Sequence, residues 1–157
     1  MSIERARAHL EQYGLADRIQ EFSDSSATVA LAAERLGVEP ARIAKTLSFM
    51  VDGGPVLIVA AGDVKVDNGK YKAMFHTKAK MLTPEQAEEL VGHGVGGVCP
   101  FGVRDGVRVY LDQSLKRFTT VFPAAGTPAS AIELTIPEIE QASGALEWVD
   151  VTKLPAE

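Results

Sequence analysis

Apolar residues recur at a helical spacing near the start of the chain, which predicts a first helix over residues 3–13. The apolar stripe of this helix consists of Ile3, Ala6, Leu10 and Tyr13. A second helix is predicted over residues 29–36, because Gly37 can end it and a hydroxyl residue, Thr28 or Ser26, can cap its start.

From Lys45 the period changes to two, which is the spacing of a strand. One predicted face holds Lys45, Leu47, Phe49 and Val51, and the other holds Thr46, Ser48 and Met50. A glycine-containing turn at residues 52–54 leads into a second strand over residues 56–61. This strand is apolar on both faces, so we expect it in the centre of a sheet.

Helices and strands alternate irregularly in the rest of the chain. Helices are predicted over residues 68–75 and 83–91 and after Thr135, and strands over residues 107–111, 118–122, 131–134 and 146–151. The helix at residue 83 is the best marked, because Thr83, Pro84 and Gln86 form the signature of a capping box. Hairpins among interleaved helices predict an α+β fold with a mixed sheet.

Composition and charge exclude several classes of function. The 157 residues have the length of one domain, and the net charge of −5 argues against broad binding to nucleic acid. One cysteine and three scattered histidines make neither a disulfide nor a metal-ligand spacing. Without a signal peptide or a long apolar run, we expect a cytoplasmic protein that needs no membrane, metal or cofactor.

Lysines cluster locally between residues 65 and 80, where the only acidic residue is Asp67. The cluster consists of Lys65, Lys70, Lys72, Lys78 and Lys80. It is either a solvated face or a patch that contacts phosphate groups.

The most unusual segment is the loop at residues 92–102, in which five of eleven residues are glycine. Glycines carry an entropic cost on folding, so a loop this rich in them indicates close approach of backbone amides to a ligand. Because the loop follows the end of a helix, the positive end of a helix dipole does not face it, as it would in a phosphate-binding loop.

Three side chains are candidates for chemistry. Lys45 either meets an anion at the mouth of an apolar strand face or extends to solvent at the strand end. Cys99 is either a nucleophile, with His93 six residues earlier, or a small buried apolar residue. Asp112 either lines a site or caps the turn at residues 114–115, whereas Glu133 is predicted to face solvent.

Together these segments resemble the YbaK/EbsC family of aminoacyl-tRNA deacylases, which is related to the editing domain of bacterial prolyl-tRNA synthetases. The resemblance is carried by Thr28-Val29-Ala30-Leu31-Ala32-Ala33, Ala44-Lys45-Thr46-Leu47, Gly96-Gly97-Val98-Cys99-Pro100-Phe101-Gly102, Val109-Tyr110-Leu111-Asp112, and Ala125-Gly126 before Ala131-Ile132-Glu133-Leu134. It implies one editing domain over residues 1–157, with a partly barrel-like mixed sheet surrounded by helices.

The resemblance also implies the site. The implied catalytic residues are Lys45, Gly96, Gly97, Val98, Cys99 and Pro100. The implied substrate-binding residues are Phe22, Thr28, Thr46, Phe101, Gly102, Asp112 and Gly126. The lysine would hold the terminal nucleotide or the ester, the loop amides would surround the scissile carbonyl, and water or the substrate's own side chain would attack.

The implied reaction is hydrolysis of a mischarged aminoacyl-tRNA, chiefly tRNA(Pro) carrying a small wrong amino acid such as alanine, cysteine or serine. Many family members carry serine in place of Cys99, and some cysteine-specific members carry an acid in place of Ala131. The implied partners are the tRNA acceptor end and prolyl-tRNA synthetase, with the protein a monomer or weak homodimer. The alternatives are a binding module without catalysis and a thiol hydrolase that uses Cys99.

Overall fold

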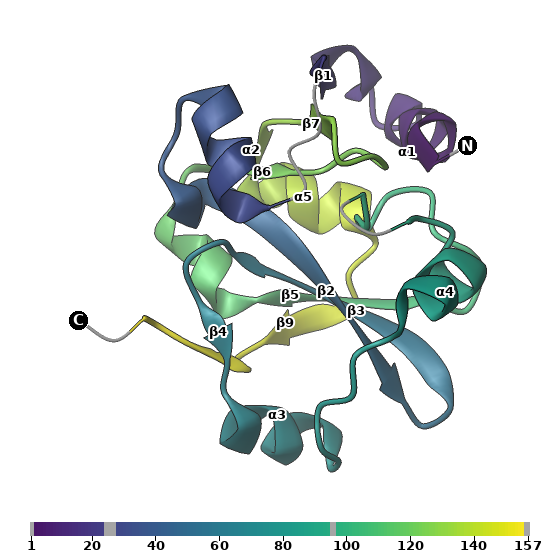
Figure 1. Ribbon diagram of the computed structural model, residues 1–157, viewed down its shortest axis with the longest axis vertical. Helices are drawn as coiled ribbons and strands as arrows, with labels where there is room; N and C mark the ends of the chain where they lie inside the picture. Colours follow the sequence, from purple (N-terminus) through teal and green to yellow (C-terminus); the bar gives the residue numbers. More distant parts are fainter. Residues whose placement is uncertain (1, 24–27, 95–96, 156–157) are drawn as a thin grey trace.

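The structure is a computed structural model that describes residues 2–23, 28–94 and 97–155. Within these residues, the central sheet has the strand order β8-β6-β2-β3-β5-β9 (Figure 1). Its strands are β2 (Ile43–Val51), β3 (Gly54–Ala61), β5 (Arg108–Asp112), β6 (Thr120–Pro123), β8 (Leu134–Thr135) and β9 (Glu147–Val149). β2 pairs antiparallel with β3 and parallel with β6, so the sheet is mixed as predicted.

Two short strand pairs flank this sheet. β1 (Gln20–Glu21) pairs with β7 (Ser130–Ala131), and β4 (Lys65–Val66) pairs with β10 (Thr152–Lys153), both antiparallel. The helices are α1 (Ser2–Glu11), α2 (Val29–Leu36), α3 (Asn68–Phe75), α4 (Pro84–Gln86) and α5 (Ile136–Ser143). Short 3₁₀ turns occupy Ala16–Arg18, Pro40–Arg42 and Gln113–Arg117.

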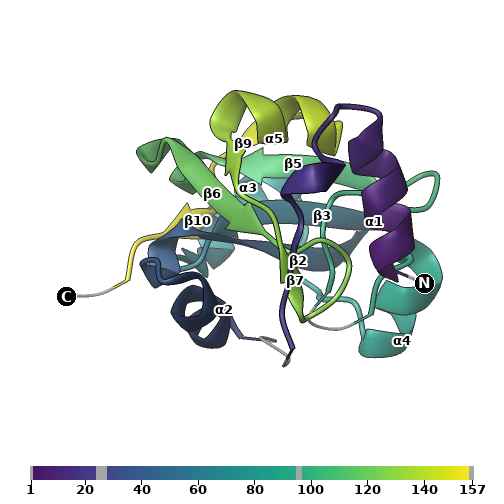
Figure 2. The ribbon, with the colours of Figure 1, turned by 90° about the horizontal axis from the view of Figure 1, so that it is seen from above.

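Helices cover both faces of the sheet. Figure 2 shows α1 and α5 on one side of it and α2 and α4 towards the other. The largest apolar cluster joins Leu10 of α1 and Ile139 of α5 to Val59 of β3. The central position predicted for residues 56–61 is confirmed, because every residue from Val56 to Ala61 is fully buried.

The predicted caps are present. The Leu31 N–H donates to Thr28 Oγ1 at 3.1 Å, which starts α2, whereas the alternative cap Ser26 lies outside the described residues. The capping box of Thr83 is complete, with Gln86 as the reciprocal partner. After α4 the chain continues as a π-helical turn over Ala87–Val91, which the sequence did not indicate.

Several predicted boundaries are wrong. The first helix ends at Glu11, and Tyr13 is 38% exposed and so leaves the predicted stripe. The strand predicted over residues 131–134 is two short strands, because β7 pairs with β1 whereas β8 pairs with β6.

Two further strands end elsewhere than predicted. The strand predicted over residues 118–122 is Thr120–Pro123, two residues later at its start. The last predicted strand stops at Val149, and the chain then crosses to β4, with the Val151 N–H bound to Asp112. None of the described helices is long and apolar enough to cross a membrane.

Candidate functional site in a gap of the sheet edge

The main candidate site lies where the pairing of β2 is interrupted. At its start β2 pairs with β6, through Ile43 and Ala44. At its far end the segment around Met81 takes the place of a partner strand, since the Met50 N–H donates to Lys80 O at 2.8 Å and the Leu82 N–H donates to Ser48 O at 3.1 Å. Between these two points no described strand pairs with this edge of β2, and a cleft opens there.

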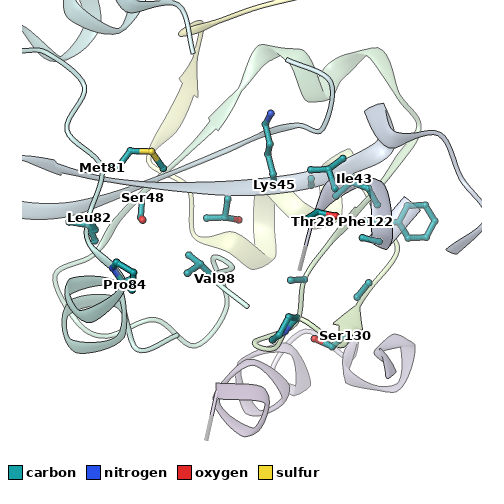
Figure 3. A pocket seen from close by; sticks show the side chains of 18 of the residues that line it. Thr28, Ile43, Lys45, Ser48, Met81, Leu82, Pro84, Val98, Phe122 and Ser130 are labelled. Carbon is teal, nitrogen blue, oxygen red and sulfur yellow. The ribbon is translucent and has the colours of Figure 1, made fainter. Parts of the chain in front are cut away.

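The cleft encloses a cavity of about 290 Å³, which is near the lower limit for a small-molecule site. Its walls are mostly apolar and include Val29, Ile43, Leu82, Val98 and Phe122. Its polar groups come from Thr28, Thr46, Ser48, Thr83 and Ser130. Figure 3 shows the Ser48 side chain on the Val98 side of β2. The cavity therefore suits a small, largely apolar ligand with few polar groups.

The glycine loop reaches this cavity through a single residue among those described, Val98. The preceding Gly97 is buried against the second turn-rich loop. A Cβ at Gly97 would lie 2.5 Å from Gly126 O and 2.7 Å from the Thr127 Cα. Gly126 itself has a φ of 100°. The two loops thus pack backbone to backbone, which explains Gly97 and Gly126 in physical terms. Gly96 lies outside the described residues.

Cys99 points into the core and has the properties of a structural residue. It is fully buried, and burial raises the pKa of its thiol to about 12. His93 Nε2 lies 3.6 Å from Cys99 Sγ, so the two residues suggested as a pair by the sequence are in contact. However, His93 Nε2 must donate its proton to Phe101 O, at 2.6 Å, because a carbonyl only accepts. The histidine therefore presents an N–H, and not a base, to the thiol.

Lys45 places its backbone at the cavity and its ammonium elsewhere. Figure 3 shows the side chain leaving β2 on the side opposite to Val98 and Ser130. Its Nζ donates to Val64 O and, at 3.4 Å, to Gly62 O. Burial lowers the pKa of Lys45, and nearby Asp63 partly opposes this shift. In this conformation the ammonium does not share the cavity with Val98.

Other predicted site residues divide into two groups. Thr28 and Thr46 line the cavity. Four other predicted residues are not among its described lining, namely Phe22, Phe101, Gly102 and Asp112. Their described contacts are structural, and two of these residues show this best.

Asp112 is fully buried and accepts hydrogen bonds from Ser114 N, Val151 N and Thr152 Oγ1, at 2.7–3.0 Å. A Cβ at Gly102 would meet Arg5 O at 2.4 Å, so this glycine serves close packing against α1. Asp112 thus takes the capping role that the sequence left open.

Pro100, like Cys99, is buried and is not among the described cavity-lining residues. Glu133 is exposed as predicted and is bound by Arg42 and Thr120.

The five clustered lysines are all exposed, and Lys70 binds Asp150 and Thr152 O. Contact of these lysines with phosphate stays a prediction. Within the described ranges, no group of three or more histidine, cysteine or acidic residues could hold a metal ion.

Sequence reasoning missed part of the cavity wall, namely Ile43, Leu82, Pro84, Phe122 and Ser130. For Leu82 and Pro84, the signal that could have found them is the Thr83-Pro84 capping box. Because proline has no N–H, it ends the pairing of this segment with β2 and starts α4 in the same step.

These features define an α+β domain with a narrow ligand cleft at a sheet edge. The family model of the aminoacyl-tRNA editing domain matches residues 24–142. Protein YwhH of Bacillus subtilis, which is uncharacterised, is 52% identical over 98% of both chains. A candidate Cys-tRNA(Pro)/Cys-tRNA(Cys) deacylase, EbsC of Enterococcus faecalis, is 31% identical over 80% of this chain and 79% of its own.

A solved structure of a candidate trans-editing enzyme for prolyl tRNA synthetase has the same fold. It superposes with a TM-score of 0.87 at 31% identity over 97% of both chains. The chain belongs to the aminoacyl-tRNA editing domain family. The predicted family, the partly barrel-like fold and the deacylase class of enzyme are thereby confirmed.

Proposed function

We propose that this protein hydrolyses tRNA(Pro) that carries a small wrong amino acid, namely alanine, cysteine or serine. The observation that carries the proposal is the size of the cavity, about 290 Å³ with mostly apolar walls. A cavity of this size accepts an aminoacyl group and part of the terminal nucleoside, and leaves the rest of the tRNA outside. The names of EbsC and of the trans-editing enzyme support the choice of tRNA(Pro).

The proposed reaction needs no protein nucleophile. Water attacks the ester carbonyl carbon, the bond between that carbon and the ribose oxygen breaks, and the ribose oxygen takes a proton, so the products are the amino acid and tRNA. Backbone amides near Val98 would stabilise the negative charge that develops on the carbonyl oxygen. The buried, protonated thiol of Cys99 fits this scheme, because it packs in the apolar core and is not among the described residues that line the cavity.

Lys45 can contribute only by moving. No described strand covers β2 beside it, so its long side chain can pass round this open edge from Gly62 and Val64 into the cavity. We propose that the ammonium makes this move when a phosphate or a developing negative charge enters the site, because it then exchanges carbonyl partners for an anion. The role of Lys45 is thus conditional on substrate.

The test is a deacylation assay with tRNA(Pro) charged separately with alanine, cysteine, serine and proline. We expect at least one small amino acid to be released at least tenfold faster than proline, since a small cavity discriminates by size. Equal rates for all four would contradict size selection. Binding without hydrolysis above the spontaneous rate would identify a binding module instead.

A pair of variants tests whether the cavity is the sieve. Val98→Ala widens the cavity, and it should raise hydrolysis of Pro-tRNA(Pro) relative to the small substrates. Val103→Ala is the matched control, because Val103 packs against the same apolar cluster but does not belong to the described cavity wall. If both variants leave the ratio unchanged, Val98 does not contact the substrate side chain.

A further inference from the structure

The open edge of β2 presents main-chain hydrogen-bonding groups to the cavity. Ser48 O and Met50 N bond to the segment around Met81, so even-numbered residues direct their backbone groups toward this edge. In a strand the backbone groups of successive residues point to opposite edges. Thr46, two residues before Ser48, therefore directs its N–H and C=O toward the same edge, where the cavity lies.

The hairpin gives independent support for this orientation. β2 and β3 are joined by a two-residue turn, and the residues that flank it, Val51 and Gly54, are partners in the register. Asp52 and Gly53 in the turn both have positive φ values, 52° and 78°. Residues flanking such a turn form a hydrogen-bonded pair, so odd-numbered residues of β2 bond to β3. This leaves the backbone groups of Thr46 for the other edge.

Neither of the two segments that pair with this edge of β2, β6 and the segment around Met81, reaches the N–H and C=O of Thr46. Continuing the pairing of Leu82 with Ser48 would bring residue 84 opposite Thr46 O, but Pro84 has no N–H to donate. On the other flank, the register with β6 ends at the pair Ala44 and Pro123. Among the described strands, none satisfies Thr46.

The described residues that line the cavity around Thr46 place no charged group inside it. Lys45 is the only ionisable residue among its described lining, and the Lys45 ammonium lies on the opposite side of β2. A positively charged ligand group would therefore meet carbonyl and hydroxyl oxygens without a nearby cation to repel it. An α-ammonium group is such a group, and an aminoacyl ester carries one next to its carbonyl.

We infer that the substrate's amino acid binds Thr46 as a one-residue β-bridge. Its α-ammonium donates to Thr46 C=O, and its ester carbonyl accepts from Thr46 N–H, as the two residues of a hydrogen-bonded antiparallel pair do. Paired residues place their side chains on the same face, so the substrate side chain would enter the cavity that Thr46 lines. This inference rests on the proposed function and specifies a requirement for a free α-amino group.

The test compares two stable analogues by calorimetry, 3′-alanylamino-3′-deoxyadenosine and its 3′-lactylamino counterpart. They differ only in the replacement of the ammonium by a hydroxyl group. We expect the lactyl analogue to bind roughly 5- to 13-fold more weakly, because its hydroxyl can still donate one hydrogen bond but lacks the charge that makes the bond from an ammonium stronger. Equal affinities, or no binding of either analogue, would overturn the inference.

Two variants separate the main chain from the side chain. Thr46→Val removes the hydroxyl alone and should leave the ratio of the two affinities unchanged. Thr46→Pro removes the N–H that faces the open edge, a position where proline is tolerated, and should weaken both analogues by a similar factor. If Thr46→Val binds the two analogues equally well, the ammonium contacts the Thr46 hydroxyl, and the main-chain bridge is refuted. If Thr46→Pro does not fold, the two analogues, measured on the unmutated protein and on Thr46→Val, still test the main-chain bridge.

The outcome is separable from that of the proposed function. Failure to deacylate any charged tRNA, together with the expected preference for the alanyl analogue, would refute the hydrolytic proposal and retain the bridge. Deacylation of alanyl-tRNA(Pro) with equal affinities for the two analogues would support the hydrolytic proposal and refute the bridge.

Discussion

Replacing Gly97 with alanine would put a methyl group where backbone atoms already lie. The added Cβ would be 2.5 Å from Gly126 O and 2.7 Å from Thr127 Cα, distances that real Cβ atoms essentially never show. To reach an ordinary contact of 3.4 Å, the two loops must separate by about 0.9 Å. Backbone neighbours cannot rotate away as a flexible side chain can, so the strain has no local relief.

Overpacking of this kind lowers the free energy of unfolding by roughly 1–3 kcal/mol, and we expect the upper end here. For a domain of this size, that corresponds to a fall in Tm of roughly 6–12 °C. The neighbouring Val98 lines the cavity, and a displacement of about 1 Å at a catalytic site can cost about 100-fold in rate. We therefore expect kcat/KM for the best small aminoacyl-tRNA(Pro) to fall by between tenfold and 100-fold.

Gly94→Ala is the matched control, because a Cβ at Gly94 meets nothing within 4 Å in the described structure. Thermal unfolding and single-turnover deacylation of both variants provide the comparison. If Gly97→Ala matches Gly94→Ala in both Tm and rate, the two loops are not packed as described, and the wall formed by Val98 does not depend on them.

Three further changes test individual side chains. Lys45→Met removes the hydrogen bonds to Gly62 O and Val64 O. We expect it to lower the free energy of unfolding in urea by about 1–2 kcal/mol and the deacylation rate at least tenfold. An unchanged rate would show that the ammonium only supports the turn at residues 62–64. Cys99→Ala should keep the deacylation rate and lower the free energy of unfolding by about 1–2 kcal/mol. In the unmutated protein the thiol, with a pKa of about 12, should resist alkylation at pH 8, and rapid alkylation would contradict its burial.

Burial holds the pKa of His93 below 6.5, so between that lowered value and 6.5 the unfolded chain binds a proton that the folded chain does not. The free energy of unfolding should therefore fall as the pH falls through this window, and less so in His93→Gln; identical pH profiles in denaturant titrations would refute this.

The sequence was sufficient to predict elements whose pattern is local. Some predictions depend only on near neighbours, and all of these are present: the change of period at Lys45, the apolar strand over residues 56–61, the capping box at Thr83 and the helix after Thr135. The split of residues 131–134 depends on two different partner strands far along the chain, so no local pattern could reveal it.

The candidate site was predictable only in part for the same reason. Strand parity correctly grouped Leu47, Phe49 and Val51, which pack in one apolar cluster. Lys45, which has the same parity, leaves β2 on the side away from Val98 and Ser130 (Figure 3). Parity could not show that the cavity lies on the other face, because helices cover both sides of the sheet. The glycine loop was predicted to bring backbone amides close to a ligand, and this stays a prediction; the partner described for Gly97 is another loop of the same chain.

The open edge of β2 links the position of Lys45 to the ligand that the site would take. A lysine ammonium fixed inside the cavity would repel an α-ammonium, and at about 4 Å the repulsion amounts to roughly 4 kcal/mol near a protein surface. Held on Val64 O and Gly62 O, the Lys45 charge is outside the cavity while the amino acid enters. Closing the edge with a paired strand would remove both the backbone groups of Thr46 and the path for Lys45. The three residues of β2 that have no described strand partner on this edge would thus serve both parts of our proposal, the binding of the substrate's amine and the movement of a cation to its ester.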